Sequence, residues 1–183
     1  IIITGGFTKE HFSTCSAVNN YQKENCSCQT ESVSEEIYSY RDHNFTKIRW
    51  EKNEEVGDRL KRFGHSMITI NEEVYVLGGF IQYTGYVIDI IRLVPVNDVK
   101  TNTFTFDLEF IEISKSMEGR MFANINVVFD YIVIFGGSRD GRTLNDLWII
   151  NTKNWETSVI EIDLQYLYPR CGASSCVLYE KEN

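Results

Sequence analysis

Three apolar runs in this sequence each end in a pair of glycines. The runs cover residues 1–6, 74–79 and 132–137. Their glycine pairs are Gly5-Gly6, Gly78-Gly79 and Gly136-Gly137. A motif that recurs along a chain indicates a repeated supersecondary unit, and such a unit decides the whole fold. The spacing between the pairs is uneven, as expected when insertions fall in the loops of a repeat.

The residues around the second and third glycine pairs predict antiparallel hairpins. Residues 62–70 alternate between apolar and polar side chains and lead through a turn at 71–73 into the second apolar run. That pattern is typical of two strands joined by a tight turn. After the third pair, a polar stretch at 138–143 is followed by two strand-like segments within 144–162. Each unit is therefore predicted to supply four short strands.

These strands and glycines resemble the kelch repeat, whose unit is a four-stranded antiparallel blade of a β-propeller. The best copy covers residues 119–163, where the glycine pair is followed by Trp148 and Trp155. A second copy, at 59–113, keeps the glycine pair but replaces the later aromatic pair. Several copies together are more specific than any single pair of glycines.

The resemblance implies an all-β fold: a kelch-type β-propeller with about three four-stranded antiparallel blades plus the start of another, in an incomplete ring. Residues 1–183 would form this single partial propeller. The first copy, at 1–53, lacks its first strand and carries a polar loop insertion at 7–35, whereas residues 169–183 resemble the opening strand of the next blade. Because propellers usually have roughly four to eight blades, further blades are expected from the rest of the chain, another copy or a partner chain.

The glycine pairs and the three tryptophans are expected to be structural. Glycine at the end of a blade's second strand permits backbone angles that a β-carbon forbids, and it lets a neighbouring chain approach closely. Trp50, Trp148 and Trp155 would fill the space between successive sheets, since each buries a large apolar area. These residues are therefore predicted to pack the blades rather than to line a ligand site.

The net charge of −8 argues against direct nucleic-acid binding. A sequence-independent nucleic-acid binder needs a basic face, and the densest basic cluster, at 59–62, is flanked by acidic residues and is typical of a solvated loop. No membrane contact is expected, because the longest apolar stretch, at 86–96, is broken by charges and is too short to cross a bilayer. No basic region precedes the first residues, so a signal peptide is not expected there either.

The five cysteines leave the compartment open. Cys15, Cys26 and Cys28 lie in the insertion, and Cys171 and Cys176 lie near the end of the chain. This spacing does not predict a zinc site, which needs four ligands. Unpaired thiols favour a cytoplasmic or nuclear protein. The odd cysteine count and two possible N-glycosylation sequences, starting at Asn25 and Asn44, keep a secreted protein as the alternative.

No catalytic residue, metal site or cofactor site is predicted. The histidines are His11, His43 and His65, and the last is expected at the start of a blade's first strand. Asp140 and Asp146 are interpreted as turn and cap residues that follow a glycine pair, not as paired catalytic carboxylates. The resemblance leaves an enzyme as the alternative: a copper oxidase similar to galactose oxidase, or an accessory domain or subunit of a nuclear or transferase enzyme.

The resemblance favours a non-catalytic scaffold that presents loops to a partner protein, such as an adaptor, because kelch propellers are mostly interaction modules. The expected contact segments are the insertion and the loops at 80–86 and 138–142. The candidate binding residues are Tyr83, Tyr86, Arg139 and Arg142. Tyrosine and arginine often dominate interface energetics, and the arginines would suit an acidic partner. The two tyrosines are equally compatible with burial between blades.

Overall fold

A computed structural model describes residues 2–4, 37–41, 43–50, 59–98, 103–114, 117–161 and 167–179. Within these ranges the regular elements are β-strands, and the only helical residues are Arg59 and Leu60. The chain forms two compact units. The N-terminal unit contains residues 1–63, 81–83 and 95–107, and the C-terminal unit contains residues 64–80, 84–94 and 108–183. The predicted all-β fold is confirmed.

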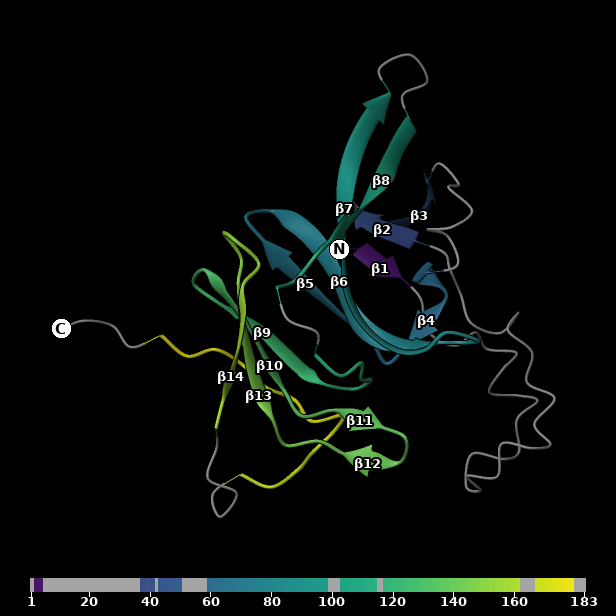
Figure 1. Cartoon of the computed structure of the whole chain (residues 1–183). Helices are drawn as coiled ribbons and strands as arrows, with labels where there is room; N and C mark the ends of the chain where they lie inside the picture. Colours follow the sequence, from purple (N-terminus) through teal and green to yellow (C-terminus); the bar gives the residue numbers. More distant parts are fainter. Residues whose placement is uncertain are drawn as a thin grey trace, which may run out of the picture. The chain divides into compact units, whose positions relative to one another are not determined.

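The N-terminal unit contains an antiparallel meander of three short strands (Figure 1). They are β1 (Ile2–Thr4), β2 (Ile37–Arg41) and β3 (Asn44–Trp50). In the same unit β3 pairs in parallel with the start of β8 (Thr103–Ile111), where Trp50 lies opposite Phe106. The short strand β4 (Arg62–Phe63) ends the unit's first segment. Gly5, Gly6, the insertion at 7–35 and the side chain of Trp50 lie outside the described part.

The C-terminal unit contains a four-stranded part of a larger, eight-stranded sheet, called the first sheet below, and a separate four-stranded antiparallel sheet. The first sheet consists of β5 (Ser66–Ile70), most of β6 (Glu73–Ile81) and β7 (Gly85–Asp98), and the end of β8. Asn71 and Glu72 join β5 to β6, and both adopt positive φ angles, of 49° and 69°. Such a two-residue turn matches the right-handed twist of the strands that it joins. The hairpin predicted around residue 71 is therefore present.

The second sheet has the order β14-β13-β10-β9 (Figure 1). Its strands are β9 (Asn124–Val128), β10 (Tyr131–Phe135), β13 (Leu147–Asn151) and β14 (Thr157–Ile160). Between β10 and β13 lies a separate hairpin of β11 (Ser138–Arg139) and β12 (Arg142–Thr143), which turns at Asp140-Gly141. The four strands predicted for the third repeat are thus observed, with this small hairpin added to them.

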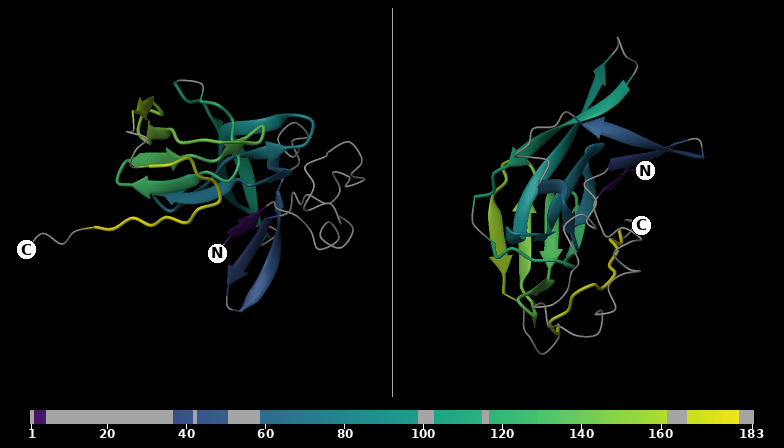
Figure 2. Two further views of the ribbon diagram at one scale, coloured as in Figure 1. Left: turned by 90° about the horizontal axis from the view of Figure 1, so that it is seen from below. Right: turned by 90° about the vertical axis from the view of Figure 1, so that its right-hand side faces the viewer.

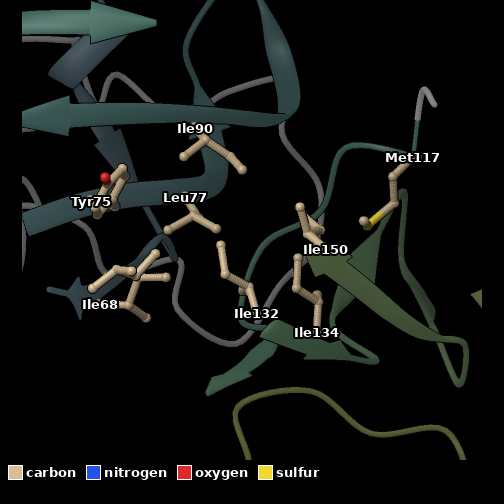
Figure 3. Packing of buried hydrophobic residues seen from close by; sticks show 9 residues of the cluster. Ile68, Tyr75, Leu77, Ile90, Met117, Ile132, Ile134 and Ile150 are labelled. Carbon is tan, nitrogen blue, oxygen red and sulfur yellow. The ribbon is translucent and has the colours of Figure 1, made fainter. Parts of the chain in front are cut away.

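The hydrophobic core of the C-terminal unit lies between its two sheets (Figure 3). Ile132 and Ile134 alternate with half-buried Val133 along β10, so that both isoleucines face the first sheet. Ile150 on β13 lies opposite Ile132 and adds to the same surface. From the first sheet the core receives Ile68, Ile70, Tyr75, Leu77 and Ile90. Each fully buried aliphatic side chain contributes about 1.5–3 kcal/mol, so these residues hold the sheets together.

Each described glycine pair binds the main chain that enters the next repeat. Gly79 donates its N–H to the carbonyl oxygen of Arg120 at 2.8 Å, and Gly137 donates to the carbonyl oxygen of Arg170 at 2.9 Å. The φ angles also repeat, at 63° and 101° for the second pair and 62° and 103° for the third. A β-carbon on Gly136 would lie 2.4 Å from the Arg170 carbonyl oxygen. The pair is glycine because the following repeat passes so close.

A second line of main-chain hydrogen bonds joins equivalent residues of three repeats. Phe122 donates its N–H to the carbonyl oxygen of Gly64 at 2.7 Å, and Gly172 donates to the carbonyl oxygen of Phe122 at 2.9 Å. All three residues have φ angles between 56° and 65°. The three therefore occupy the same position in successive repeats.

The segment at 167–179 extends along the second sheet, where Figure 2 shows it in yellow. Asn126 Nδ2 on β9 donates to Ser175 Oγ at 2.7 Å, and Ser175 donates to Asn124 Oδ1 at 3.3 Å. The ring of Tyr179 meets that of Phe129 edge to face, with centroids 5.5 Å apart. The segment predicted to open another blade thus lies beside β9, but it forms no regular strand in the described part of the chain.

Replacement of Gly136 by alanine should destabilise the protein by about 3 kcal/mol, because the new methyl group meets the Arg170 carbonyl and the residue needs a positive φ. Gly141→Ala is the matched control. Gly141 also has a positive φ, of 75°, but a β-carbon there would meet no atom within 4 Å, so the loss should be about 1 kcal/mol. Urea unfolding measures both variants, and equal losses would refute the close-approach explanation.

Candidate functional site: an aromatic and arginine cluster

Four side chains of the C-terminal unit form an aromatic-arginine cluster, defined as Phe80, Tyr86, Arg139 and Arg142. Phe80 lies near the end of β6 and Tyr86 at the start of β7, and their rings meet edge to face with centroids 5.0 Å apart. Arg139 lies at the end of β11 and Arg142 at the start of β12. The cluster therefore joins the β6–β7 hairpin of the first sheet to the small β11–β12 hairpin.

Arg139 is the residue that connects the small hairpin to the tyrosine. Its guanidinium carbon lies 5.9 Å from the centre of the Tyr86 ring, within the range of a cation–π interaction. Its Nη1 atom donates to the carbonyl oxygen of Gly119 at 3.3 Å, and its Nε atom lies 3.3 Å from Asp140 Oδ2. These contacts hold Arg139 in place. The side chain is also half-buried, so it has little freedom to move toward a ligand.

Arg142 extends further into solvent. Its side chain is 65% exposed, and its ion pair with Glu118 is long, at 3.9 Å from Nη2 to Oε2. An exposed pair of this length contributes about 0–1 kcal/mol to stability. Arg142 can therefore exchange Glu118 for the carboxylate of another molecule at small cost to the fold.

A buried ion pair supports the cluster from within. The side chain of Arg120 is 1% exposed, and its Nη1 and Nη2 atoms donate to the two carboxylate oxygens of Asp146 at 2.5 and 2.8 Å. Nη1 also donates to the carbonyl oxygen of Gly136 at 3.0 Å. Trp148 Nε1 donates to Asp146 Oδ2 at 2.7 Å. One guanidinium thus links the glycine pair, the start of β13 and a core tryptophan.

The environment of Asp146 keeps its carboxylate ionised. Burial alone would raise the pKa of this carboxyl, but the hydrogen bonds from Arg120 and Trp148 and the positive charge of Arg120 outweigh burial. The pKa therefore lies below the ordinary value of 3.8. Since Arg120 Nε donates to the Glu118 carbonyl at 3.1 Å and Arg139 binds the next carbonyl, of Gly119, the ion pair positions the segment under the cluster.

A family model described as "KLHDC2/KLHL20/DRC7 Kelch-repeats domain" matches residues 1–182. The chain belongs to the kelch-repeat family. No curated protein is significantly similar to it. The sheets of the C-terminal unit are kelch blades, so the fold predicted from the glycine pairs is confirmed, and the described strands do not close a ring. Kelch domains commonly serve as protein-interaction modules, which agrees with the general class predicted from sequence.

Among the four predicted binding residues, the structure brings three together. Tyr86, Arg139 and Arg142 belong to the cluster in the C-terminal unit. Tyr83 belongs to the N-terminal unit, where its side chain is 92% exposed and its φ angle is 67°. Of the two tyrosines, Tyr83 is thus exposed and Tyr86 is packed.

Asp146 has a role beyond that of the cap residue predicted from the sequence. Its carboxylate is the partner of buried Arg120, a residue that was not among the predicted site residues. A signal for it exists in the sequence. An arginine stands at the start of each of the later kelch repeats, at Arg62, Arg120 and Arg170. Asp140, by contrast, does lie in a turn, with a φ angle of 49°.

The predicted absence of catalytic and metal sites remains a prediction. Within the described ranges, no group of three His, Cys, Asp or Glu side chains is arranged to hold a metal ion. Cys171 and Cys176 are exposed free thiols, and the other cysteines lie outside these ranges. No helix in the described part of the chain has the length and apolarity needed to span a membrane.

Replacement of Asp146 by asparagine should destabilise the protein by about 2 kcal/mol, because it leaves the buried Arg120 guanidinium without a counter-charge. The expected loss is smaller than for a fully buried pair, since the Asp146 side chain is 32% exposed. Asp140→Asn is the control: that carboxylate pairs with Arg139 but is 63% exposed, so its loss should change stability by less than about 0.5 kcal/mol. If urea unfolding shows comparable losses of stability for the two variants, the Arg120–Asp146 ion pair does not stabilise the fold as described.

The same ion pair should make the protein sensitive to acid. A carboxyl with a lowered pKa stabilises the folded state above its unfolded pKa, and this contribution disappears as the pH falls through the folded pKa. The free energy of unfolding of the wild type should therefore decrease as the pH drops below about 4. Asp146→Asn should show a shallower acid dependence. Identical pH profiles for the two proteins would rule out a stabilising ionised Asp146.

Proposed function

We propose that this kelch domain is a non-catalytic scaffold that binds an acidic segment of a partner protein through the aromatic-arginine cluster. The observation that carries the proposal is the position of Arg142 opposite Arg139 in the β11–β12 hairpin, where Arg139 stacks on Tyr86. Interface hot spots are enriched in tyrosine and arginine and lie on rigid, partly desolvated surfaces. The cluster supplies a rigid arginine, a rigid aromatic ring and one extended arginine.

An acidic partner would be attracted by the two arginines of the cluster and not by the net charge of the chain. The protein carries a net charge of −8, so its surface as a whole repels acidic segments. At the cluster, two arginines face Asp140 and Glu118, and both of these acidic side chains are exposed. A partner carboxylate would displace Glu118 from Arg142, which costs little because that ion pair is long.

We also propose that a further blade covers the outer face of the second sheet. Tyr131 and Ile160 are exposed on this face, and Val133, Phe135 and Ile149 are half-buried there. The segment at 167–179 already contacts the same face through Asn124 and Asn126. An apolar sheet face of this kind favours association. The added blade would come from further chain, a second copy or a partner chain.

Substitution of Arg142 tests the binding site. The full chain is used as bait, and the retained proteins are identified by mass spectrometry. Arg142→Glu should reduce capture of the true partner at least about tenfold, because it places a like charge against the acidic segment. The thermal midpoint should stay unchanged, since the Arg142 side chain is exposed.

Lys153→Glu is the matched control for that experiment. Lys153 is also an exposed cation, paired with Asp130, but it lies in the turn between β13 and β14 and outside the cluster. Both variants change the net charge equally. Capture should survive Lys153→Glu. A partner that is retained equally by both variants would remove the cluster from the proposed function.

A further inference from the structure

Strand β14 is an open edge of the second sheet. It pairs with β13 on one side and ends the strand order of the sheet. Val159 is 55% exposed and Ile160 is 41% exposed, and consecutive strand residues point to opposite faces. Apolar side chains are therefore exposed on both faces of a strand whose second edge carries no other strand among the described residues.

The hydrogen-bond register shows which backbone groups of β14 point outward. Asn151 N–H donates to the Glu156 carbonyl at 2.9 Å, and Ile149 lies opposite Ser158. In an antiparallel pair the hydrogen-bonded positions alternate, so the N–H and C=O groups of Val159 point away from β13. Thr157 confirms this direction, because its N–H donates outward to Ser114 Oγ at 2.9 Å. Val159 thus offers a donor and an acceptor at the sheet edge.

Two acidic side chains flank β14. Glu156 precedes the strand and Glu161 follows it, and both are exposed. A strand added along this edge would place the two ends of the peptide near these carboxylates. Lysine or arginine at the ends of the peptide would therefore be attracted to the strand.

The β7–β8 hairpin shows that an outer strand of this fold accepts an added strand. β8 pairs with β7 on one side, and in the N-terminal unit its other side pairs with β3 at Thr105 and Phe106. That added strand runs parallel to β8. β14 follows β13 as β8 follows β7, so it occupies the corresponding outer position in the next repeat.

We propose that β14 binds a basic, strand-forming peptide segment of a partner protein by adding it to the edge of the second sheet. The peptide backbone pairs with the N–H and C=O of Val159. A lysine or arginine at each end of the peptide meets Glu156 or Glu161. Strand addition of this kind draws affinity from the main chain and specificity from alternate side chains. The site is separate from the aromatic-arginine cluster.

A synthetic peptide of alternating valine and threonine with lysine at both ends is the probe. Its binding to the full chain is measured by fluorescence anisotropy, alongside a peptide of the same core with glutamate at both ends. The lysine peptide should bind at least about tenfold more tightly, and raised salt should reduce the difference. Equal binding of the two peptides, or no binding of the lysine peptide, would overturn the proposal.

Val159→Pro removes the outward N–H without removing a hydrogen bond to β13. Proline is tolerated on an edge strand when its nitrogen faces solvent. The variant should bind the lysine peptide about tenfold more weakly. Val159→Thr keeps both the N–H and the branched side chain, so it should bind as the wild type does. Equal affinity of the proline variant and the wild type would refute backbone pairing at this strand.

Two further measurements keep the test decisive if Val159→Pro fails to fold. Glu156→Gln combined with Glu161→Gln should weaken binding of the lysine peptide at least about fivefold, because both flanking charges are lost. Amide hydrogen exchange at Val159 should slow when the peptide is added. Unchanged affinity in the glutamine variant together with unchanged exchange would overturn the proposal. Arg142→Glu should leave peptide binding intact, which separates this site from the proposed acidic-segment site.

Discussion

The close contact between each glycine pair and the main chain of the next repeat is the constraint on which the C-terminal unit depends. Gly79 binds the Arg120 carbonyl and Gly137 binds the Arg170 carbonyl with almost the same geometry. This contact fixes how one sheet follows another, and it brings the isoleucines of β10 against the first sheet. A β-carbon on Gly136 would clash with the Arg170 carbonyl and disturb this packing.

The buried guanidinium of Arg120 connects that contact to the surface. It binds the Gly136 carbonyl below and Asp146 beside it, while the preceding carbonyls of Glu118 and Gly119 receive hydrogen bonds from Arg120 and Arg139. The stacking of Arg139 on Tyr86 therefore has a rigid foundation. Breaking such a buried pair on one side is costly because it leaves an uncompensated charge. Arg120 thus contributes both to the stability of the fold and to the shape of the candidate site.

Local patterns were enough to predict the strands, but not the pairings between side chains. The alternation at 66–70, the glycine pair within β6 and the glycine pair after β10 are short-range signals, so both hairpins were predictable. Arg120 and Asp146 lie in different segments, and their contact depends on packing between repeats. The open edge of β14 could not be predicted from the sequence either. Its residues have the same β-branched and apolar character as inner strands, and only the strand order makes Val159 an outer residue.

The line of hydrogen bonds through Gly64, Phe122 and Gly172 has a consequence for how such a protein can evolve. Phe122, in the middle of the line, uses its amide toward the preceding repeat and its carbonyl toward the following one. Successive copies are thus joined head to tail by atoms that every amino acid except proline possesses. A duplication or deletion of one copy in the gene would preserve this join wherever the joining residue keeps its positive φ angle, while the lengths of the intervening loops would remain free to change.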